Sequence, residues 1–291
     1  MRPIYNYIVL FLFINIQVFS QNIQSPSEYL GYEIGTQFSR HSQVIDYFDY
    51  VSNELPDNVK MEKYGETYER RPLYLAYISS KENIKNIDLI RKNNLSNAGV
   101  IKKEINSSIN KDIAIVWLSY NVHGNESSST EASMKTLYLL LTKNSNLLDN
   151  TIVIIDPCIN PDGRDRYANW YNQTVTIPYN TNSKSREHDE PWPGGRANHY
   201  LYDLNRDWAW ITQTESKSRL KIYNKWLPHV HVDYHEQGID NPYYFAPAVE
   251  PYHEIISKWQ RDFQKEIGKN NAKYFDKNGW LYFTKETFDL L

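Results

Sequence analysis

Two segments of the chain contain residue types that bind zinc in proteins. The first, His123-Gly124-Asn125-Glu126, places an imidazole and a carboxylate three residues apart, where a strand pattern changes to a helix pattern. Open α/β sheets place their ligands at that edge, and Zn²⁺ accepts a mixture of nitrogen and oxygen donors. A helix-capping role for Glu126 near the positive end of the helix fits the same spacing.

The second segment is an alternating strand with three histidines, residues 228–235. Because side chains alternate along a strand, His229, His231 and His235 share one face and Glu236 points to the other. His235 lies at the carboxyl end, with the best access to the sheet edge, whereas His229 and His231 fit structural roles lower on the strand. Two His and one Glu leave the fourth tetrahedral position for water, which is typical of a catalytic zinc.

A third polar segment, residues 203–208, carries Asn205 and Arg206 and follows Arg196. A guanidinium fork and an amide suit the terminal carboxylate of a substrate. A second arginine nearby could polarise a carbonyl and stabilise the oxyanion that forms from it. Taken alone, the same charges also fit ordinary surface ion pairs.

The spacing of apolar residues predicts the elements that position these groups. Continuous apolar runs at 113–118 and 151–156 predict buried strands, and further strands are expected at 72–79, 230–235 and 280–283. Helical spacing predicts helices at 40–55, 126–141, 212–226 and 251–269, whereas residues 81–111 show no strong pattern and 169–202 read as a loop. The alternation of helix and strand predicts an α/β fold with a mainly parallel sheet.

Composition limits the classes of function. The 291 residues are 41% hydrophobic, which is sufficient for a core, and the net charge of -3 gives no support to nucleic acid as a partner. The single cysteine, Cys158, excludes an intrachain disulfide. It follows an apolar run and fits a small buried residue better than a thiol nucleophile.

The N-terminus has the pattern of a secretory signal peptide, which we expect to comprise residues 1–20. A basic start is followed by an apolar run at 8–14 that is short for a membrane span, and then by a polar segment from Gln21. The mature protein is therefore expected to be secreted or periplasmic, with no transmembrane anchor after signal removal.

Four motifs occur in an order that resembles the zinc carboxypeptidase family. They are HGNE at 123–126, Asn-Pro-Asp-Gly at 160–163, GGRAN followed by DLNRDW between 194 and 208, and the late His235. The resemblance covers residues 123–247 and implies a three-layer α/β/α fold with a mixed, mainly parallel central sheet. The implied site has His123, Glu126 and His235 as ligands of Zn²⁺, Asn205 and Arg206 on the substrate's C-terminal carboxylate, Arg196 on the scissile carbonyl, and Asp203 orienting His123.

The resemblance implies a zinc-dependent metallocarboxypeptidase. It would hydrolyse the C-terminal bond of a peptide or amide substrate that has a free carboxylate, through a zinc-activated water. An amidase acting on cell-wall or acyl-amino-acid substrates and a zinc-retaining, non-catalytic binding protein are the alternatives. Arg164 and Arg166 are rival candidates for the carbonyl role.

The family's general base is a glutamate on a late strand, downstream of the last zinc ligand. Glu250, Glu254 and Glu266 are expected on the helix over 251–269 as solvated charges, and Glu286 matches no motif. We therefore expect the base to lie beyond the given chain. Residues 21–291 would then form a zinc carboxypeptidase-like catalytic domain that is truncated at its C-terminus and inactive alone.

Overall fold

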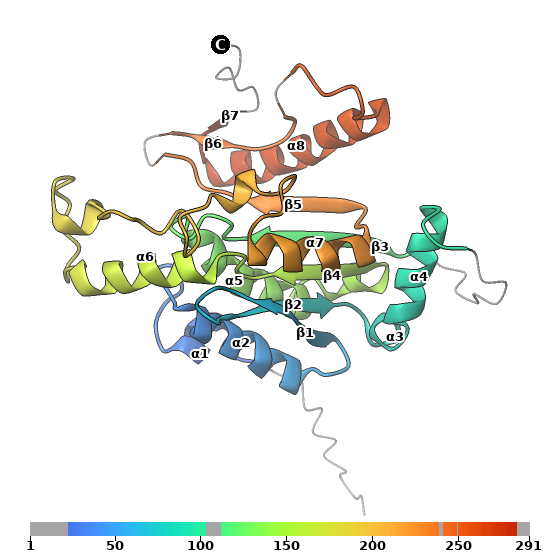
Figure 1. Ribbon diagram of the computed structural model, residues 1–291, viewed down its shortest axis with the longest axis horizontal. Coiled ribbons are helices and arrows are strands. Elements are labelled where there is room, and N and C mark those ends of the chain that lie inside the picture. Colours follow the sequence, from blue (N-terminus) through green and yellow to red (C-terminus); the bar gives the residue numbers. More distant parts are fainter. Residues whose placement is uncertain (1–22, 103–111, 239–240, 249, 284–291) are drawn as a thin grey trace, which may run out of the picture. The chain divides into compact units, whose positions relative to one another are not determined.

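The computed structural model describes residues 23–102, 112–238, 241–248 and 250–283 (Figure 1). The expected signal peptide at 1–20 and Glu286 lie outside the described residues. The chain divides into two compact units, with the boundary between Tyr234 and His235. Within the described ranges, no helix combines the length and the apolar character needed to cross a membrane.

The first unit is built on a five-stranded sheet with the order β1-β2-β4-β3-β5. Strand β3 runs parallel to both of its neighbours, β4 and β5, whereas β2 runs antiparallel to both β1 and β4. The predicted mixed sheet is therefore confirmed, with β2 reversed relative to the other strands. The strands are β1 (Val59–Glu66), β2 (Pro72–Ile78), β3 (Ala114–Tyr120), β4 (Thr151–Asp156) and β5 (Val230–Tyr234).

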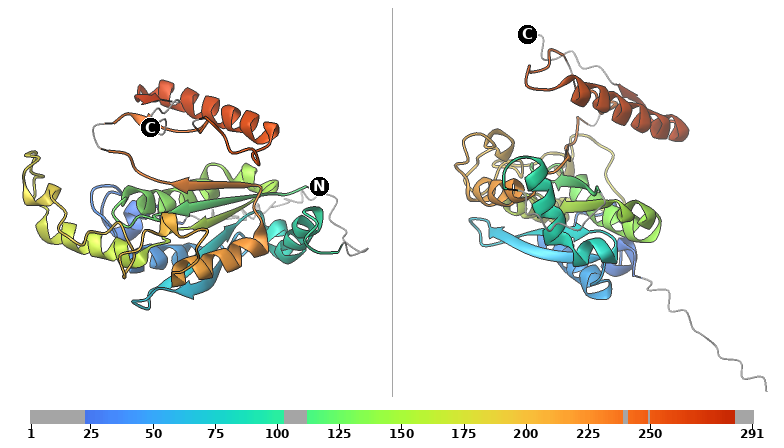
Figure 2. Two further views of the ribbon diagram at one scale, coloured as in Figure 1. Left: turned by 45° about the horizontal axis from the view of Figure 1, so that its top comes forward. Right: turned by 90° about the vertical axis from the view of Figure 1, so that its right-hand side faces the viewer.

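Helices cover both faces of this sheet (Figures 1 and 2), which confirms the three-layer α/β/α arrangement. The helices are α1 (Pro26–Leu30), α2 (His41–Glu54) and α5 (Ser128–Thr142) on one face, and α3 (Lys81–Lys85), α4 (Ile87–Asn97) and α7 (Thr214–Trp226) on the other.

Two apolar cores hold the layers together because successive strand residues point to opposite faces. Leu118 of β3 packs with Phe48 of α2 and Met134 of α5. Its neighbour Trp117 packs in the other core, with Ile222 and other residues of α7. Each fully buried side chain of this size contributes about 1.5–3 kcal/mol through the hydrophobic effect, so the apolar strand runs fix the layers.

Four α-helices and one strand of the first unit were not expected from the sequence: α1, α3, α4, α6 and β1. Helix α6 (Pro161–Thr174) begins at the Asn-Pro-Asp-Gly motif and occupies residues 169–174, where a loop was expected. The Asn160 side chain caps it by accepting a hydrogen bond from the Gly163 amide at 3.0 Å, and Pro161 fits the first turn. Helix α4 buries only Ile87, Ile90 and Leu95, too few apolar residues for a clear periodic pattern.

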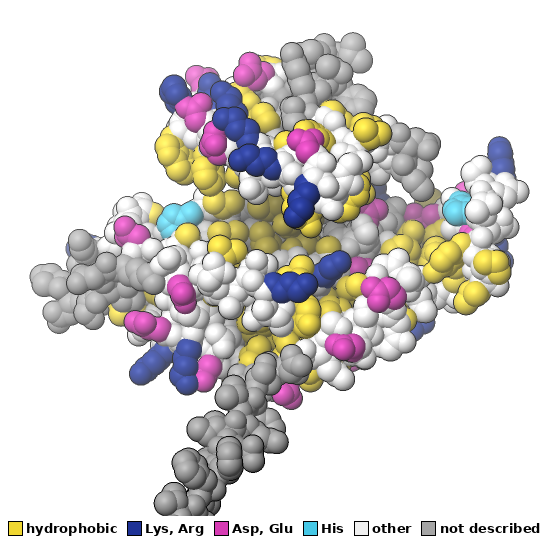
Figure 3. Space-filling model, turned by 180° about the vertical axis from the view of Figure 1, so that it is seen from behind, with side chains coloured by type: hydrophobic (Ala, Val, Ile, Leu, Met, Phe, Trp, Pro, Cys, Tyr) yellow, Lys and Arg dark blue, Asp and Glu magenta, His cyan; other side chains and the backbone are white. Residues whose placement is uncertain are grey.

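The second unit contains helix α8 (Lys258–Asn278) and a parallel pair of short strands, β6 (Tyr243–Tyr244) and β7 (Tyr282–Phe283). Helix α8 starts later than predicted because Ser257 caps it, so Glu250 and Glu254 precede the helix and only Glu266 lies in it. Glu266 pairs with Lys269 at 2.7 Å, as expected of a solvated charge. Figure 3 shows Lys and Arg side chains interspersed among Asp and Glu on the face that it draws.

Three short 3-10 helices complete the described elements of the first unit: η1 (Ser145–Asp149), η2 (Arg186–His188) and η3 (Leu204–Arg206).

Candidate metal centre

The carboxyl ends of β3 and β5 lie level with each other. Tyr120 pairs with Tyr234 in the register of the two parallel strands, and their rings stack with centroids 4.4 Å apart. His123 follows Tyr120 by three residues, and His235 is bonded directly to Tyr234. The strand register therefore brings the starting points of both histidines to the same edge of the sheet.

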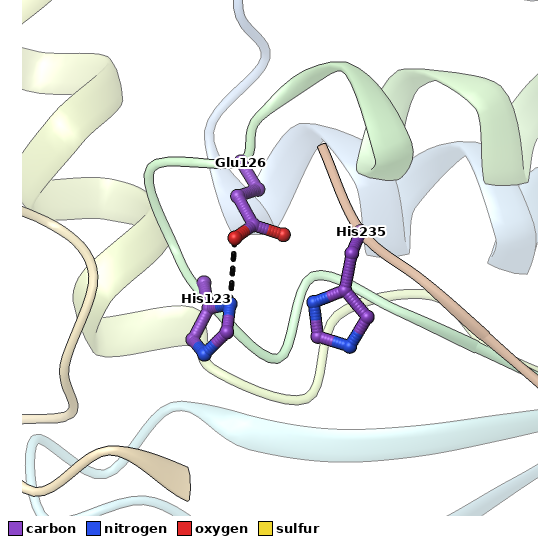
Figure 4. A group of neighbouring side chains, drawn as sticks. All are labelled: His123, Glu126 and His235. Atoms are coloured by element: carbon purple, nitrogen blue, oxygen red, sulfur yellow. Dashed lines mark hydrogen bonds and ion pairs between the residues drawn. The ribbon is translucent and has the colours of Figure 1, made fainter. Parts of the chain in front are cut away.

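His123, Glu126 and His235 form a group in which one candidate ligand atom of each lies within 4.8 Å of the others. Figure 4 shows the carboxylate of Glu126 directed at the His123 ring, with the His235 ring beside them. The Nδ1 atom of His123 lies 2.7 Å from Oε1 of Glu126. Two imidazoles and a carboxylate are the donor set of catalytic zinc sites such as His₂Glu.

Both ring nitrogens of His123 face carboxylate oxygens. Nδ1 lies against Glu126, and Nε2 lies 3.0 Å from Oδ1 of Asp203. A neutral imidazole has only one N–H, so it can donate to only one of the two carboxylates. The ring is almost completely buried. A cation between Nδ1 and Glu126 would complement this arrangement, with the Nε2–H donated to Asp203, so the residues present fit zinc.

Asp203 is held in place by the start of helix η3. Its Oδ1 atom also accepts a hydrogen bond from the backbone amide of Asn205 at 2.9 Å. Partial burial raises the pKa of Asp203, but the Asn205 amide, His123 and Arg196 outweigh it, and the pKa lies below the ordinary value. The carboxylate is therefore ionised at neutral pH and can orient the His123 ring.

Arg196 reaches the same group from the segment between α6 and η3. Its Nη2 atom lies 3.0 Å from Oδ2 of Asp203, and its Nη1 atom lies 3.5 Å from Oε1 of Glu126. The side chain is 49% exposed, so it stays accessible to a substrate.

The rival arginines are occupied elsewhere. Arg164 is fully buried, where it donates to the carbonyls of Ser39 and Ser127 and pairs with Glu131 at 2.6 Å. Arg166 donates to the carbonyl of Gly194 at 2.8 Å. Neither guanidinium is available for a scissile carbonyl, and Arg196 is the better candidate.

Asn205 and Arg206 lie on η3, directly after Asp203. Asn205 is half-buried, and Arg206 is exposed, with its guanidinium donating only to the adjacent Asn205 carbonyl in the described contacts. Asp207 anchors the other end of this turn by accepting the backbone amides of Thr212 and Gln213. The motif therefore presents an amide and a guanidinium beside the residue that orients His123.

Three glycines let the motif segments pack backbone to backbone. A Cβ atom on Gly124 would lie 2.2 Å from the carbonyl carbon of Gly163 and 2.4 Å from the carbonyl oxygen of Gly195. A Cβ atom on Gly163 would lie 2.3 Å from that same Gly195 oxygen. Since real Cβ atoms do not approach backbone so closely, the HGNE, Asn-Pro-Asp-Gly and GGRAN motifs require glycine at these positions.

Two buried asparagines hold these segments, and neither was assigned a functional role from the sequence. Asn121 donates to the carbonyl oxygens of His123, Gly124 and Glu126. Asn160 donates to the carbonyl oxygen of Arg196 at 3.1 Å. The Asn-Pro-Asp-Gly motif could have indicated a role for Asn160 from the sequence. For Asn121, the sequence offers no indication beyond its position after a strand.

The other histidines of the 228–235 segment have partners in the sheet. His229 accepts the backbone amide of Ile115 through Nδ1 at 3.0 Å, and Nε2 of His231 lies 2.9 Å from Oγ of Ser119. Burial lowers the pKa of His231, so it is neutral at pH 7. Both residues thus have the structural surroundings that were expected of them.

Cys158 is buried, and burial raises the pKa of its thiol well above the ordinary value. A thiol in this state is inert, which agrees with the interpretation as a small buried residue.

Comparisons with known proteins agree on one fold. The chain resembles carboxypeptidase A of Helicoverpa armigera, with 17% identity and a TM-score of 0.54 over 87% of this chain and 58% of that one. It also resembles a metallo-carboxypeptidase of Burkholderia cenocepacia, with 16% identity and a TM-score of 0.56 over 86% and 53% of the two chains. Bovine thrombin-activatable fibrinolysis inhibitor, solved with a tick carboxypeptidase inhibitor, is 16% identical, with a TM-score of 0.52 over 86% of this chain and 76% of that one.

The chain thus spans 58% of the length of the Helicoverpa enzyme, and at this level of identity these likenesses show the fold alone. No curated protein matches the chain. The family model for zinc carboxypeptidases matches residues 44–267, which is most of the chain. This protein therefore belongs to the zinc carboxypeptidase family, as its motifs predicted.

Proposed function

We propose that this protein is a zinc-dependent carboxypeptidase that removes the C-terminal residue of a peptide. Family membership supports a peptidase. The observation that carries the proposal is the arrangement around His123, whose two nitrogens face Glu126 and Asp203 while Arg196 contacts both carboxylates. That arrangement combines a cation site with a cationic side chain that a substrate can reach.

Each residue has a distinct role in this proposal. Arg206 and Asn205 bind the free carboxylate of the substrate, because a guanidinium and an amide can donate to both of its oxygens. Arg196 donates to the scissile carbonyl and stabilises the negative charge that develops on its oxygen. Asp203 holds His123 in the orientation that directs Nδ1 to the metal. Zinc, when bound, lowers the pKa of a water molecule and polarises the carbonyl.

None of the described carboxylates is assigned the role of general base. We expect the general-base glutamate to lie outside residues 1–291. We therefore expect the 291-residue chain alone to bind zinc without efficient turnover. The proposed activity is that of the whole protein.

Metal exchange and substrate trimming test the proposal. The full-length protein should release C-terminal residues from hippuryl-phenylalanine or hippuryl-arginine, lose this activity with 1,10-phenanthroline, and regain it with added Zn²⁺. Arg206→Ala should raise KM at least tenfold, since a charged hydrogen bond to the substrate carboxylate is worth about 1.5–3 kcal/mol. A protein that holds stoichiometric zinc and cleaves no C-terminal residue or amide would contradict the proposal.

We also propose that the protein is exported to the periplasm or the medium. The basic start, the apolar run at 8–14 and the polar segment from Gln21 support this. N-terminal sequencing of the protein from the culture should find Gln21 or a close neighbour as the first residue, and an intact Met1 in the cell interior would contradict export.

A further inference from the structure

Glu190 joins the two loops that carry the candidate site. One carboxylate oxygen, Oε2, accepts a hydrogen bond from the Asn125 side-chain amide at 2.9 Å. The other, Oε1, accepts one from the backbone amide of Gly195. Asn125 lies between His123 and Glu126, and Gly195 directly precedes Arg196. A single side chain therefore connects the metal-binding loop with the loop that presents the arginine.

The other described connections between these loops are a neutral backbone hydrogen bond and the Arg196–Glu126 ion pair at 3.5 Å, which joins side chains and leaves the backbone free. The Arg196 carbonyl accepts the Gly124 amide at 3.4 Å and the neutral Asn160 amide at 3.1 Å. Hydrogen bonds to an ionised carboxylate are roughly twice as strong as bonds between neutral groups. Because the Arg196 side chain is half-exposed, its position depends on the backbone that carries it. The contact from Glu190 to Gly195 acts on that backbone.

We propose that Glu190 is a positioning residue of the active site, an inference that rests on the proposed carboxypeptidase function. Its carboxylate sets the distance between Arg196 and the His123–Glu126 loop. Arg196 must meet the scissile carbonyl as negative charge develops there, and a misplacement of about 1 Å can cost on the order of a hundredfold in rate. Loss of Glu190 should therefore lower kcat, while zinc binding and KM change little.

Glu187 provides a matched control within the same segment. Its carboxylate is buried, whereas Glu190 is partly buried, and it accepts hydrogen bonds from the Thr176 amide at 2.7 Å and the Asn180 amide at 2.5 Å. These partners lie at 176–180, in the part of the segment that extends beyond α6 in Figures 1 and 2. The contacts of Glu187 with Thr176 and Asn180 thus stabilise that extension, whereas those of Glu190 reach the site loops.

The test compares Glu190→Ala with Glu187→Ala in the full-length, zinc-loaded protein by hydrogen–deuterium exchange. Glu190→Ala should accelerate exchange at both 123–127 and 194–198 by about tenfold or more, because a charged hydrogen bond contributes about 1.5–3 kcal/mol. Glu187→Ala should accelerate exchange at 176–189 instead. Zinc content should stay stoichiometric in both variants. Glu190→Gln keeps one acceptor for Gly195 and should restore part of the protection at 194–198.

Kinetics supply the second readout. With hippuryl-phenylalanine or hippuryl-arginine, Glu190→Ala should lower kcat about 10–100-fold with KM within about threefold, and Glu187→Ala should keep both near wild type. Unchanged exchange at 123–127 and 194–198 in Glu190→Ala would overturn the inference, as would an unchanged kcat in an active protein. If the wild-type protein cleaves neither probe, the proposed function fails, and the exchange data still decide whether Glu190 holds the two loops.

Discussion

Within the described residues, two clusters combine histidine, carboxylates and an arginine, and one of them has the arrangement expected of a metal site. In the first, His123, Glu126 and His235 bring their ligand atoms within 4.8 Å of one another, and Arg196 contacts Glu126 at 3.5 Å. In the second, Glu69, Asp162 and His199 meet the same distance criterion. Proximity of suitable atoms therefore does not distinguish them.

The position of the arginine does distinguish them. Arg71 binds Glu69 and Asp162 through one nitrogen, at 2.5 and 2.8 Å, and Asp165 through another, at 2.7 Å. Its guanidinium contacts both carboxylates of the cluster directly, so a cation could bind between them only by displacing it. At the first cluster, Arg196 makes its shorter contact with Asp203, on the Nε2 side of the His123 ring, and lies 3.5 Å from Glu126.

Removal of one ligand should give the largest difference between the clusters. His123→Ala should reduce zinc affinity on the order of a thousandfold or more, because a three-ligand site loses a nitrogen donor. His199→Ala should leave zinc affinity unchanged. Competition with a fluorescent chelator measures both, and equal losses in the two variants would remove the distinction.

Removal of Arg196 should act on the chemical step. Arg196→Ala should lower kcat about 10²–10³-fold, since one donor to a developing oxyanion is worth that much in other hydrolases. Zinc content should remain at the wild-type level. If the main effect were on KM, Arg196 would bind the substrate in its ground state, which would contradict a role in stabilising the oxyanion.

Removal of the Asp203 carboxylate, which contacts His123, should reduce zinc affinity less than removal of His123 itself. Asp203→Asn should weaken zinc binding about 10–100-fold, because partners that orient a metal-binding histidine typically contribute that much. Asp207→Asn is the control, because Asp207 accepts the backbone amides of Thr212 and Gln213 at the other end of the same turn. Similar zinc affinities in the two variants would contradict the role of Asp203.

The smallest expected effect concerns the cluster of Glu69, Asp162 and His199. It is a change in the pH dependence of folding stability. Partial burial raises the pKa of Glu69, but hydrogen bonds from Arg71 and His199 outweigh it, and the pKa lies below its ordinary value of 4.5. A lowered pKa stabilises the fold above pH 4.5, and this contribution disappears as pH falls through the folded-state value. Since solvent screens this partly exposed group, Glu69→Gln should reduce the free energy of unfolding at pH 7 by less than about 1 kcal/mol, with no loss at acid pH. Urea denaturation at both pH values measures the difference.

The sequence predicted the elements whose apolar runs are continuous. Residues 151–156 form β4 with the expected bounds, and the helix expected at 212–226 is α7. The sequence did not predict α4, whose residues are mostly polar, or α6, although Asn160 and Pro161 are typical of a helix start.

The candidate site was predictable to the extent that its residues occur in local motifs. HGNE and DLNRDW each place several groups within a few residues, so His123, Glu126 and Asp203 could be named, and the structure brings them together. Their roles in binding zinc remain predictions. Glu190 could not be named, because it is 65 residues from Asn125 and only the packing of two loops brings them into contact.

The location of bound zinc tests the central claim most directly. Crystals of the zinc-loaded protein, measured at the zinc absorption edge, should show one anomalous peak between Nδ1 of His123 and the carboxylate of Glu126, with His235 as a further ligand. The position between Glu69, Asp162 and His199 should show none. A peak only at the second position, or zinc bound without His123, would contradict the account.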